Sequence, residues 1–213
     1  MHYQIGKAHP ADFKEAWPGE LGMFSHYDAV ASPPQPLCLI TTLKENGKPN
    51  ACFHAGVLFS GDSDSYYAVL AGMGGNHTYE NILRDNEFCI NFLSSAYYAA
   101  CGLTIEHNGD DDDEIAAGGF TAEPCETIKP PRIGEALVSF ECKLISTHDI
   151  SGKGGKDLFA GEVLLVHVDG DRHTAEGICG PGGFMYNINS LHNFDTGERE
   201  PYAAAYLTAF GIG

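Results

Sequence analysis

The hydrophobic positions of this chain fall mainly into short runs that are apolar throughout or alternate with polar residues, a pattern typical of β-strands. Six such segments predict six strands, at Leu37–Thr42, Ala51–Ser60, Ser65–Met73, Phe88–Phe92, Ala136–Ile150 and Asp157–Val168. Asn46-Gly47 separates the first two segments and favours a hairpin, because both residues tolerate positive φ. The last segment is expected to present one apolar face, made of Leu158, Ala160, Leu164, Val166 and Val168.

Helical periodicity is confined to short segments. A helix is predicted around Ala11–Ala16, another from the N-cap candidate Asn76 to about Asn86, and a third over residues 94–101. Residues 107–119 contain four consecutive aspartates and are expected to form a solvated loop. Six strands with a few short helices predict a mainly β protein. One closed antiparallel barrel is favoured, because closure removes the exposed strand edges.

The domain organisation follows from where this pattern begins and ends. Residues 1–35 are weakly patterned and are interpreted as an N-terminal arm, and residues 36–170 as the barrel domain. Residues 171–213 are rich in Gly, Asn and Tyr and are expected to form a tail that packs on the barrel or on a dimer partner. A chain of 213 residues suits one sizeable core better than two.

Charge and cysteine content narrow the classes of partner. The formal net charge is -17, which argues against nucleic acid and against an anionic membrane surface as partners. The seven cysteines are scattered and include no Cys-x-x-Cys pair, which favours reduced thiols and a cytoplasmic location. No signal peptide and no apolar run of transmembrane length are visible in the sequence.

A candidate phosphate site lies where a glycine-rich turn leads into the predicted helix, over Gly72–Ile82. The first N–H groups of a helix lack partners and carry partial positive charge, so Asn76, His77 and Thr78 could receive a phosphate. A plain capped helix explains the same residues. Neither a Rossmann glycine fingerprint nor a Walker loop is present, the aspartate run does not match an EF-hand loop, and no metal site is predicted.

Cys52 and His54 alternate with Phe53 on the second predicted strand. His54 is the candidate acid or base, because histidine titrates near neutral pH. Cys52 could be a redox thiol, but a half-buried thiol on a strand more often serves packing.

Several motifs, taken in order, resemble the flavin reductase-like and flavoredoxin family. They are Pro36–Thr42 with Asn46–Ala51, then Thr78–Ile82 with Glu87–Phe92, and finally Gly161-Glu162-Val163. The resemblance covers roughly residues 36–168. It departs from the family pattern before the helix, where relatives often place a Lys or Arg and where His77 is here the only candidate cation.

The resemblance implies a six-stranded antiparallel split β-barrel of Greek-key type with short helices, assembled as a homodimer with FMN near the subunit interface. The isoalloxazine would lie against the second strand, and the phosphate end would meet the first turn of the helix. The implied cofactor-binding residues are Cys52, Phe53, His54, Ala55, Asn76, His77, Thr78 and Tyr79.

Three functions remain open on the sequence alone. The first is an FMN-dependent oxidoreductase that passes electrons from NAD(P)H or a protein donor through flavin. The second is an FMN electron carrier without a substrate site of its own, whose acidic surface would suit a basic redox protein partner. The third is a split barrel that has lost flavin and binds another small ligand.

Overall fold

The computed structural model describes residues 2–211, which divide into two compact units. One unit comprises the chain up to Gln35 together with Tyr186–Ala205, and the other comprises Pro36–Met185 together with the segment from Tyr206. The first unit contains helices α1 (Glu20–Met23) and α2 (His26–Ala31) and the short antiparallel pair β10 (Tyr186–Asn187) and β11 (Ala204–Ala205). The helix predicted around Ala11–Ala16 is not formed, because that segment consists of turns and bends.

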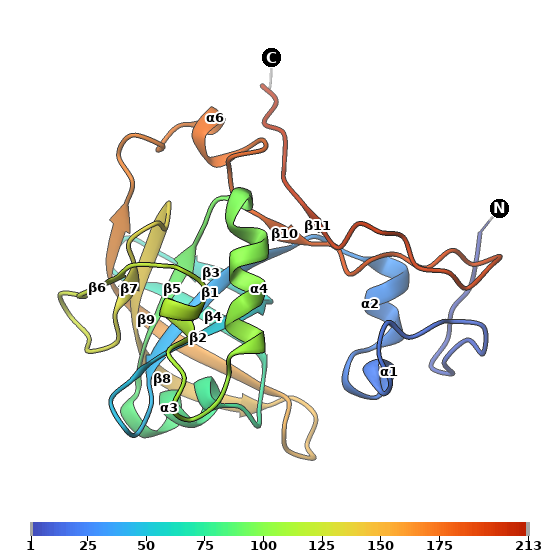
Figure 1. Ribbon diagram of the computed structural model, residues 1–213, viewed down its shortest axis with the longest axis horizontal. Helices are drawn as coiled ribbons and strands as arrows, with labels where there is room; N and C mark the ends of the chain where they lie inside the picture. The colour runs from blue at the N-terminus through green and yellow to red at the C-terminus, as the bar shows by residue number, and fades with distance from the viewer. Residues whose placement is uncertain (1, 212–213) are drawn as a thin grey trace. The chain divides into compact units, whose positions relative to one another are not determined.

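The second unit is an antiparallel β-barrel (Figure 1). Its strands pair in the order β2-β1-β5-β8-β9-β4-β3. Their bounds are β1 Gln35–Leu43, β2 Pro49–Ala55, β3 Val57–Gly61, β4 Tyr66–Met73, β5 Glu87–Phe92, β8 Val138–Asp149 and β9 Asp157–Val168. A mainly β split barrel with short helices is therefore confirmed as the fold class, although the number of strands differs from the six predicted.

The additional strand arises because the segment predicted as one strand, Ala51–Ser60, is divided at Gly56. Gly56 has φ 91°, a conformation that favours glycine, and it separates β2 from β3. β2 pairs with β1, whereas β3 pairs with β4 at the other end of the strand order. This bend joins the two ends of the sheet through a single peptide segment and closes the barrel.

The barrel core is apolar and continuous. Its largest fully buried side chains include Ile40, Leu70, Met73, Ile82, Phe88, Ile90 and Phe159. β5 is buried on both faces and is not the half-buried strand that its alternation suggested, because a second layer covers its outer side. There Asn91 receives hydrogen bonds from Ile133 N and Ser139 Oγ on the side-chain oxygen, and donates one to Leu39 O.

The apolar face expected along β9 is interrupted. A register shift in the β8–β9 ladder pairs Glu141 with Leu165 and Cys142 with Val163, so Leu164 is skipped. Phe159 is fully buried, whereas Leu164, Val166 and Val168 are 40%, 40% and 46% exposed. Burial alternates along β9, and the predicted apolar set occupies the more exposed positions, so its last three members face solvent.

Helices decorate the barrel, and three of them pack against β2 (Figure 1). They are α3 (His77–Asp85), α4 (Tyr98–Glu106, preceded by the 3-10 turn η1, Ser95–Tyr97) and α5 (Glu114–Ala117). The strand pair β6 (Ala122–Glu123) and β7 (Arg132–Ile133) follows, and α6 (Ala175–Ile178) lies beyond β9. None of the helices within residues 2–211 is long and apolar enough to span a membrane.

Candidate functional site

The β1–β2 hairpin and the first turn of α3 are joined by a buried polar network. Asn50 on β2 donates hydrogen bonds from Nδ2 to Thr78 Oγ1 (2.8 Å) and to Thr42 Oγ1 (3.1 Å). Asn50 and Thr78 are each 2% exposed. Buried amide and hydroxyl groups are costly unless they are paired, so this network fixes the position of α3 relative to β2. The strand and the helix turn to which the family resemblance assigns the two ends of FMN thus lie side by side.

The α3 N-terminus is capped as predicted from Asn76. The Asn76 side-chain oxygen accepts a hydrogen bond from Tyr79 N at 2.8 Å. The helix ends at Asn86, which adopts a left-handed conformation and whose N–H bonds to Ile82 O. Because α3 is nine residues long and well capped, its first-turn dipole is firmly oriented.

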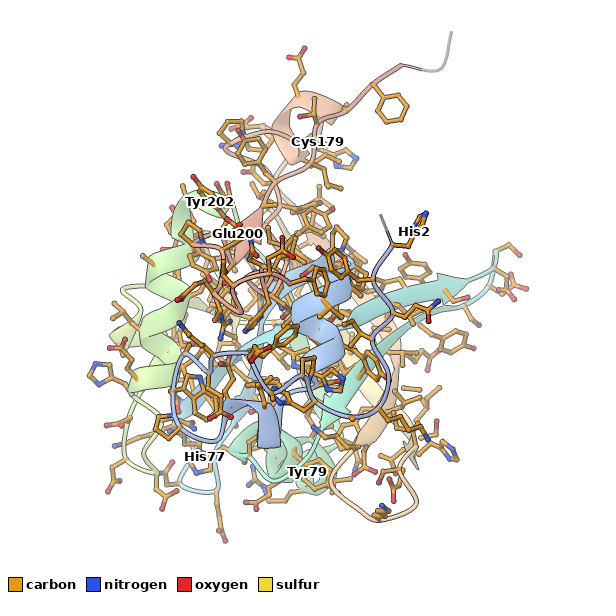
Figure 2. All side chains as sticks on the ribbon, turned by 90° about the vertical axis from the view of Figure 1, so that its right-hand side faces the viewer. His2, His77, Tyr79, Cys179, Glu200 and Tyr202 are labelled. Atoms are coloured by element: carbon orange, nitrogen blue, oxygen red, sulfur yellow. The ribbon has the colours of Figure 1, made fainter. Side chains whose placement is uncertain are left out.

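His77 and Tyr79 project to different sides of α3 (Figure 2). They are two positions apart in the helix, and such residues are separated by about 200° around the helix axis. His77 Nε2 lies 3.0 Å from Asp110 Oδ1, and its Nδ1 is buried without a hydrogen-bond partner. The Tyr79 ring lies 5.2 Å from that of Phe159, and the neighbouring Asp157 carboxylate raises the pKa of Tyr79 through a hydrogen bond. The structure therefore brings His77 and Thr78 to the hairpin side and directs Tyr79 towards β9.

The predicted β2 residues divide between the two faces of the strand, because successive strand side chains alternate. Cys52 and His54 share the face of Asn50, while Phe53 and Ala55 lie on the other, where the Phe53 ring meets that of Tyr98 on α4 at 5.8 Å. Only one of these pairs of side chains can face a given ligand. Among the described strands β2 pairs only with β1, so backbone groups on its second edge are not used in a sheet ladder.

His54 and Cys52 are both neutral groups in this environment. Burial lowers the pKa of His54 to about 4, and its Nε2 is buried without a partner. Burial also raises the pKa of Cys52, with the Glu114 carboxylate adding to the effect and the Thr78 hydroxyl opposing it. A neutral imidazole and a protonated thiol can form hydrogen bonds with a ligand. At neutral pH, however, the thiol is not an activated nucleophile and the imidazole is not a cationic acid.

The acidic segment is docked against this site through α5, so the prediction of a solvated loop over residues 107–119 is wrong from Glu114 on, whereas residues 107–113 do form a largely exposed loop. Glu114 begins α5, is completely buried, and forms an ion pair with the buried Lys44 at 2.7 Å. Lys44 Nζ also donates to the carbonyls of Gly109 (2.6 Å) and Asp112 (2.9 Å). Burial raises the pKa of Glu114, although Lys44 opposes that rise.

Lys44 and Arg84 are cations of the site that the sequence reasoning missed. Together with His77, Asn81 and Asp110 they line a cavity of about 420 Å³ between the hairpin and α3. Arg84 donates to Leu43 O (2.5 Å) and pairs with Asp85 (2.6 Å). The family pattern places a cation just before the helix, whereas here the cations lie in the hairpin and in the last turn of α3, and their signal in the sequence is the presence of Lys44 and Lys48 on either side of the Asn46-Gly47 turn.

The residues present are compatible with a flavin phosphate, with opposing features. The α3 dipole and Arg84 favour an anion, whereas the charge of Lys44 is already paired with Glu114. The exposed Asp110 carboxylate on His77 opposes an anion, as do Glu45 and Glu80, which line the same cavity. Within the described residues all seven cysteines are free, so the site contains no disulfide.

Comparison with known proteins identifies a family model that matches most of this chain, and also individual relatives. The model of the flavin reductase like domain matches residues 30–190. A protein of Aquifex aeolicus is 34% identical over 95 residues, which cover 43% of this chain and 45% of that protein. The chain thus matches less than half the length of that relative. The protein YwrF of Bacillus subtilis is 27% identical over 149 residues, which cover 67% of this chain and 73% of that protein.

Solved structures share the fold. Component B of nitrilotriacetate monooxygenase from Bacillus cereus has a TM-score of 0.72 at 18% identity, covering 94% of this chain and 98% of that chain. Flavoredoxin from Desulfovibrio vulgaris has a TM-score of 0.63 at 22% identity, with 84% and 90% covered. An FMN-binding protein from Thermus thermophilus has a TM-score of 0.66 at 17% identity, with 97% and 99% covered. With the family model matching most of its length, this chain belongs to the flavin reductase-like family.

Proposed function

We propose that this protein binds FMN and acts as an oxidoreductase that transfers electrons from NAD(P)H or a protein donor through the flavin. The observation that carries the proposal is the Asn50–Thr78 hydrogen bond, which fixes β2 against the first turn of α3. These two elements are the ones expected to hold the ring and the phosphate of FMN. Membership of the flavin reductase-like family supports a flavin as the cofactor.

In this proposal the protein contributes binding, orientation and electrostatics. The first turn of α3 and His77 hold the phosphate, and residues Cys52 to Ala55 of β2 present one face and one strand edge to the isoalloxazine. The bound flavin supplies the hydride and electron chemistry. His54 donates or accepts a hydrogen bond as a neutral imidazole, since its pKa is about 4, and it carries no net proton to the site near neutral pH.

Homodimerisation is part of the proposal. Leu164, Val166 and Val168 near the end of β9 are at least 40% exposed, and solvent-exposed apolar residues grouped on one strand are typical of an interface.

A second function, a flavin electron carrier, is favoured by the net charge of -17, because an acidic surface accelerates encounter with a basic redox protein.

The deciding experiment is a visible absorption spectrum of the purified protein before and after incubation with FMN and gel filtration. A flavin band that co-elutes with the protein supports the proposal. Protein that stays colourless at saturating FMN overturns it and leaves a split barrel for another ligand. Anaerobic titration with NADH and NADPH then separates the two functions: a reductase bleaches the flavin band and turns over in air, whereas a carrier is bleached only by a protein donor or dithionite.

A further inference from the structure

A second and larger cavity, of about 890 Å³, lies within the barrel unit. Its walls come from η1, the turn that follows β7, the end of β9 and Arg172 beyond it. It shares no lining residue with the cavity between the hairpin and α3. Its volume is in the range of small-molecule sites in proteins, roughly 300–1,000 Å³.

Cationic and hydrogen-bonding side chains from three separate segments converge on this cavity. They are Arg132 from β7, His167 from β9 and Arg172. The chain has four arginines, Arg84, Arg132, Arg172 and Arg199, so half of them line one cavity in a protein of net charge -17. The lining also contains three carboxylates, Glu123, Glu135 and Asp169, so the two guanidinium groups are local donors in a cavity that is mixed in charge.

His167 is held in a fixed orientation by a buried carboxylate. Its Nε2 lies 2.6 Å from Glu141 Oε1, and Glu141 is completely buried. Glu141 also accepts hydrogen bonds from Glu126 N (2.9 Å) and from the N–H and hydroxyl of Thr127 (2.6 and 2.5 Å). With Nε2–H donated to Glu141, Nδ1 of the neutral ring is an acceptor without a hydrogen-bond partner in the described part of the chain, and it suits a hydroxyl or other donor of a ligand.

The two arginines have unused capacity for an anion. Arg172 Nη2 donates to Gly182 O (2.6 Å) and Gly177 O (3.4 Å), which fix the side chain without neutralising its charge. No carboxylate within residues 2–211 forms an ion pair with Arg172. Arg132 pairs with Glu123, yet its Nε is buried without an acceptor. A buried N–H without an acceptor is costly, and a ligand oxygen would remove that cost.

The acidic residues of the cavity are already engaged. Glu123 is paired with Arg132, and Glu135 accepts hydrogen bonds from Thr121 N (3.0 Å) and Thr121 Oγ1 (2.8 Å). Asp169 accepts one from Asp171 N at 3.1 Å. Among the residues that the structure describes, only Glu123 of these three carboxylates is neutralised by an ion pair, so a ligand anion must lie on the side of the guanidinium groups and away from Glu135 and Asp169. Tyr97 and Leu137 provide an apolar part of the wall.

We propose that this cavity binds a small organic anion, a molecule with a carboxylate or phosphate group next to an apolar part. The charged group meets Arg132 and Arg172, a hydroxyl or other donor of the ligand meets His167 Nδ1, and the apolar part lies against Tyr97 and Leu137. Val166 and Val168 line the cavity and also belong to the proposed dimer interface, so the cavity borders that interface. None of the residues that would contact the ligand belongs to the site assigned to FMN, so the proposal does not depend on flavin binding.

Isothermal titration calorimetry of the full-length protein with citrate, benzoate and inorganic phosphate tests the site. We expect saturable binding of at least one probe, weakened about tenfold or more in Arg172→Gln and in Arg132→Gln, because each loses a charge-assisted contact. Lys153→Gln is the matched control: it removes the same charge from an exposed turn outside the cavity and should leave the affinity unchanged.

Two results overturn the proposal: no probe binds to the wild-type protein, or Lys153→Gln weakens binding as much as the arginine variants do. Arg172→Lys keeps the charge, and retained binding there, with loss in Arg172→Gln, separates a charge contact from damage to the loop. Should Arg172→Gln fail to fold, His167→Gln provides the same comparison, because its side-chain amide can still donate to Glu141. FMN retention measured on the same samples keeps this test separate from that of the proposed cofactor.

Discussion

At the scale of single residues, the contact between Asp110 and His77 decides how well an anion is received at α3. The Asp110 side chain is 92% exposed, and within residues 2–211 its carboxylate contacts His77 at 3.0 Å. A phosphate at the same turn would meet this carboxylate as a like charge. The contact therefore works against the cofactor in the proposed site, while the helix dipole works for it.

We expect Asp110→Asn to tighten FMN binding by about threefold, the modest gain appropriate to an exposed pair. Quenching of FMN fluorescence on titration with protein at low and high salt measures it. Asp111→Asn is the control, because Asp111 is equally exposed and faces Lys48 at 3.6 Å, away from His77. Equal tightening in both variants would show that only the general field had changed, and that Asp110 has no specific role.

His54 makes the stability of the protein depend on pH. Its folded pKa, about 4, lies below the ordinary value of 6.5. The unfolded chain therefore binds the proton more readily between these values, and stability falls as pH decreases below 6.5. We expect a loss of about 2 kcal/mol from this group between pH 7 and pH 5, as an upper value.

Urea denaturation at pH 7 and pH 5 measures this effect. In His54→Gln, which cannot titrate, the difference between the two pH values should shrink by that amount, whereas His107→Gln, an exposed control, should behave as the wild type. A variant His54→Gln with the full wild-type pH dependence would contradict the assignment.

At the scale of elements, the buried Lys44–Glu114 pair ties the β1–β2 hairpin to α5. Removing only one partner leaves an uncompensated buried charge, so we expect Lys44→Met to destabilise the protein by about 3 kcal/mol or more. Adding Glu114→Leu to Lys44→Met should restore most of that loss. Chemical denaturation of the two single variants and the double variant measures the coupling, and strictly additive effects would show that the pair does not act as a unit.

Much of the barrel could be predicted from local pattern, but its long-range contacts could not. Strands β1, β4, β5, β8 and β9 and the cap of α3 follow from alternation, turn residues and Asn76. The division of Ala51–Ser60 had only the isolated Gly56 as a signal, and that signal was not used. The short helix predicted at Ala11–Ala16 had weak periodicity and no tertiary support.

The candidate site shows the same limit. Placing β2 beside α3 relied on a family resemblance, and the Asn50–Thr78 bond is the physical contact that joins them. The four aspartates suggested that the whole segment is solvated. The burial of Glu114 could not be predicted, because the charge that stabilises it comes from Lys44, which is far away in the sequence. The roles assigned to Cys52, His54 and the other site residues remain predictions.

At the scale of the whole molecule, the exposed apolar residues of β9 bear on assembly. If they form the proposed dimer interface, Leu164→Lys should convert the protein from dimer to monomer, because a buried lysine without a partner is costly to desolvate. Light scattering coupled to size exclusion measures the mass. Ile105→Lys on α4, 61% exposed in the wild type, is the control and should leave the mass unchanged. A wild-type protein that elutes as a monomer would contradict the dimer outright.

The free edge of β2 has a consequence for handling the protein. An unpaired strand edge is a template for a strand from another molecule, and here α3, α4 and α5 pack against the strand that carries it. These helices contact β2 through side chains and, within the part of the chain that the structure describes, form no backbone hydrogen bonds with its free edge. We therefore expect them to detach more readily than a paired strand does. Mild heating should therefore release them before the barrel melts, and the first aggregates should be β-rich and seeded through Pro49–Ala55.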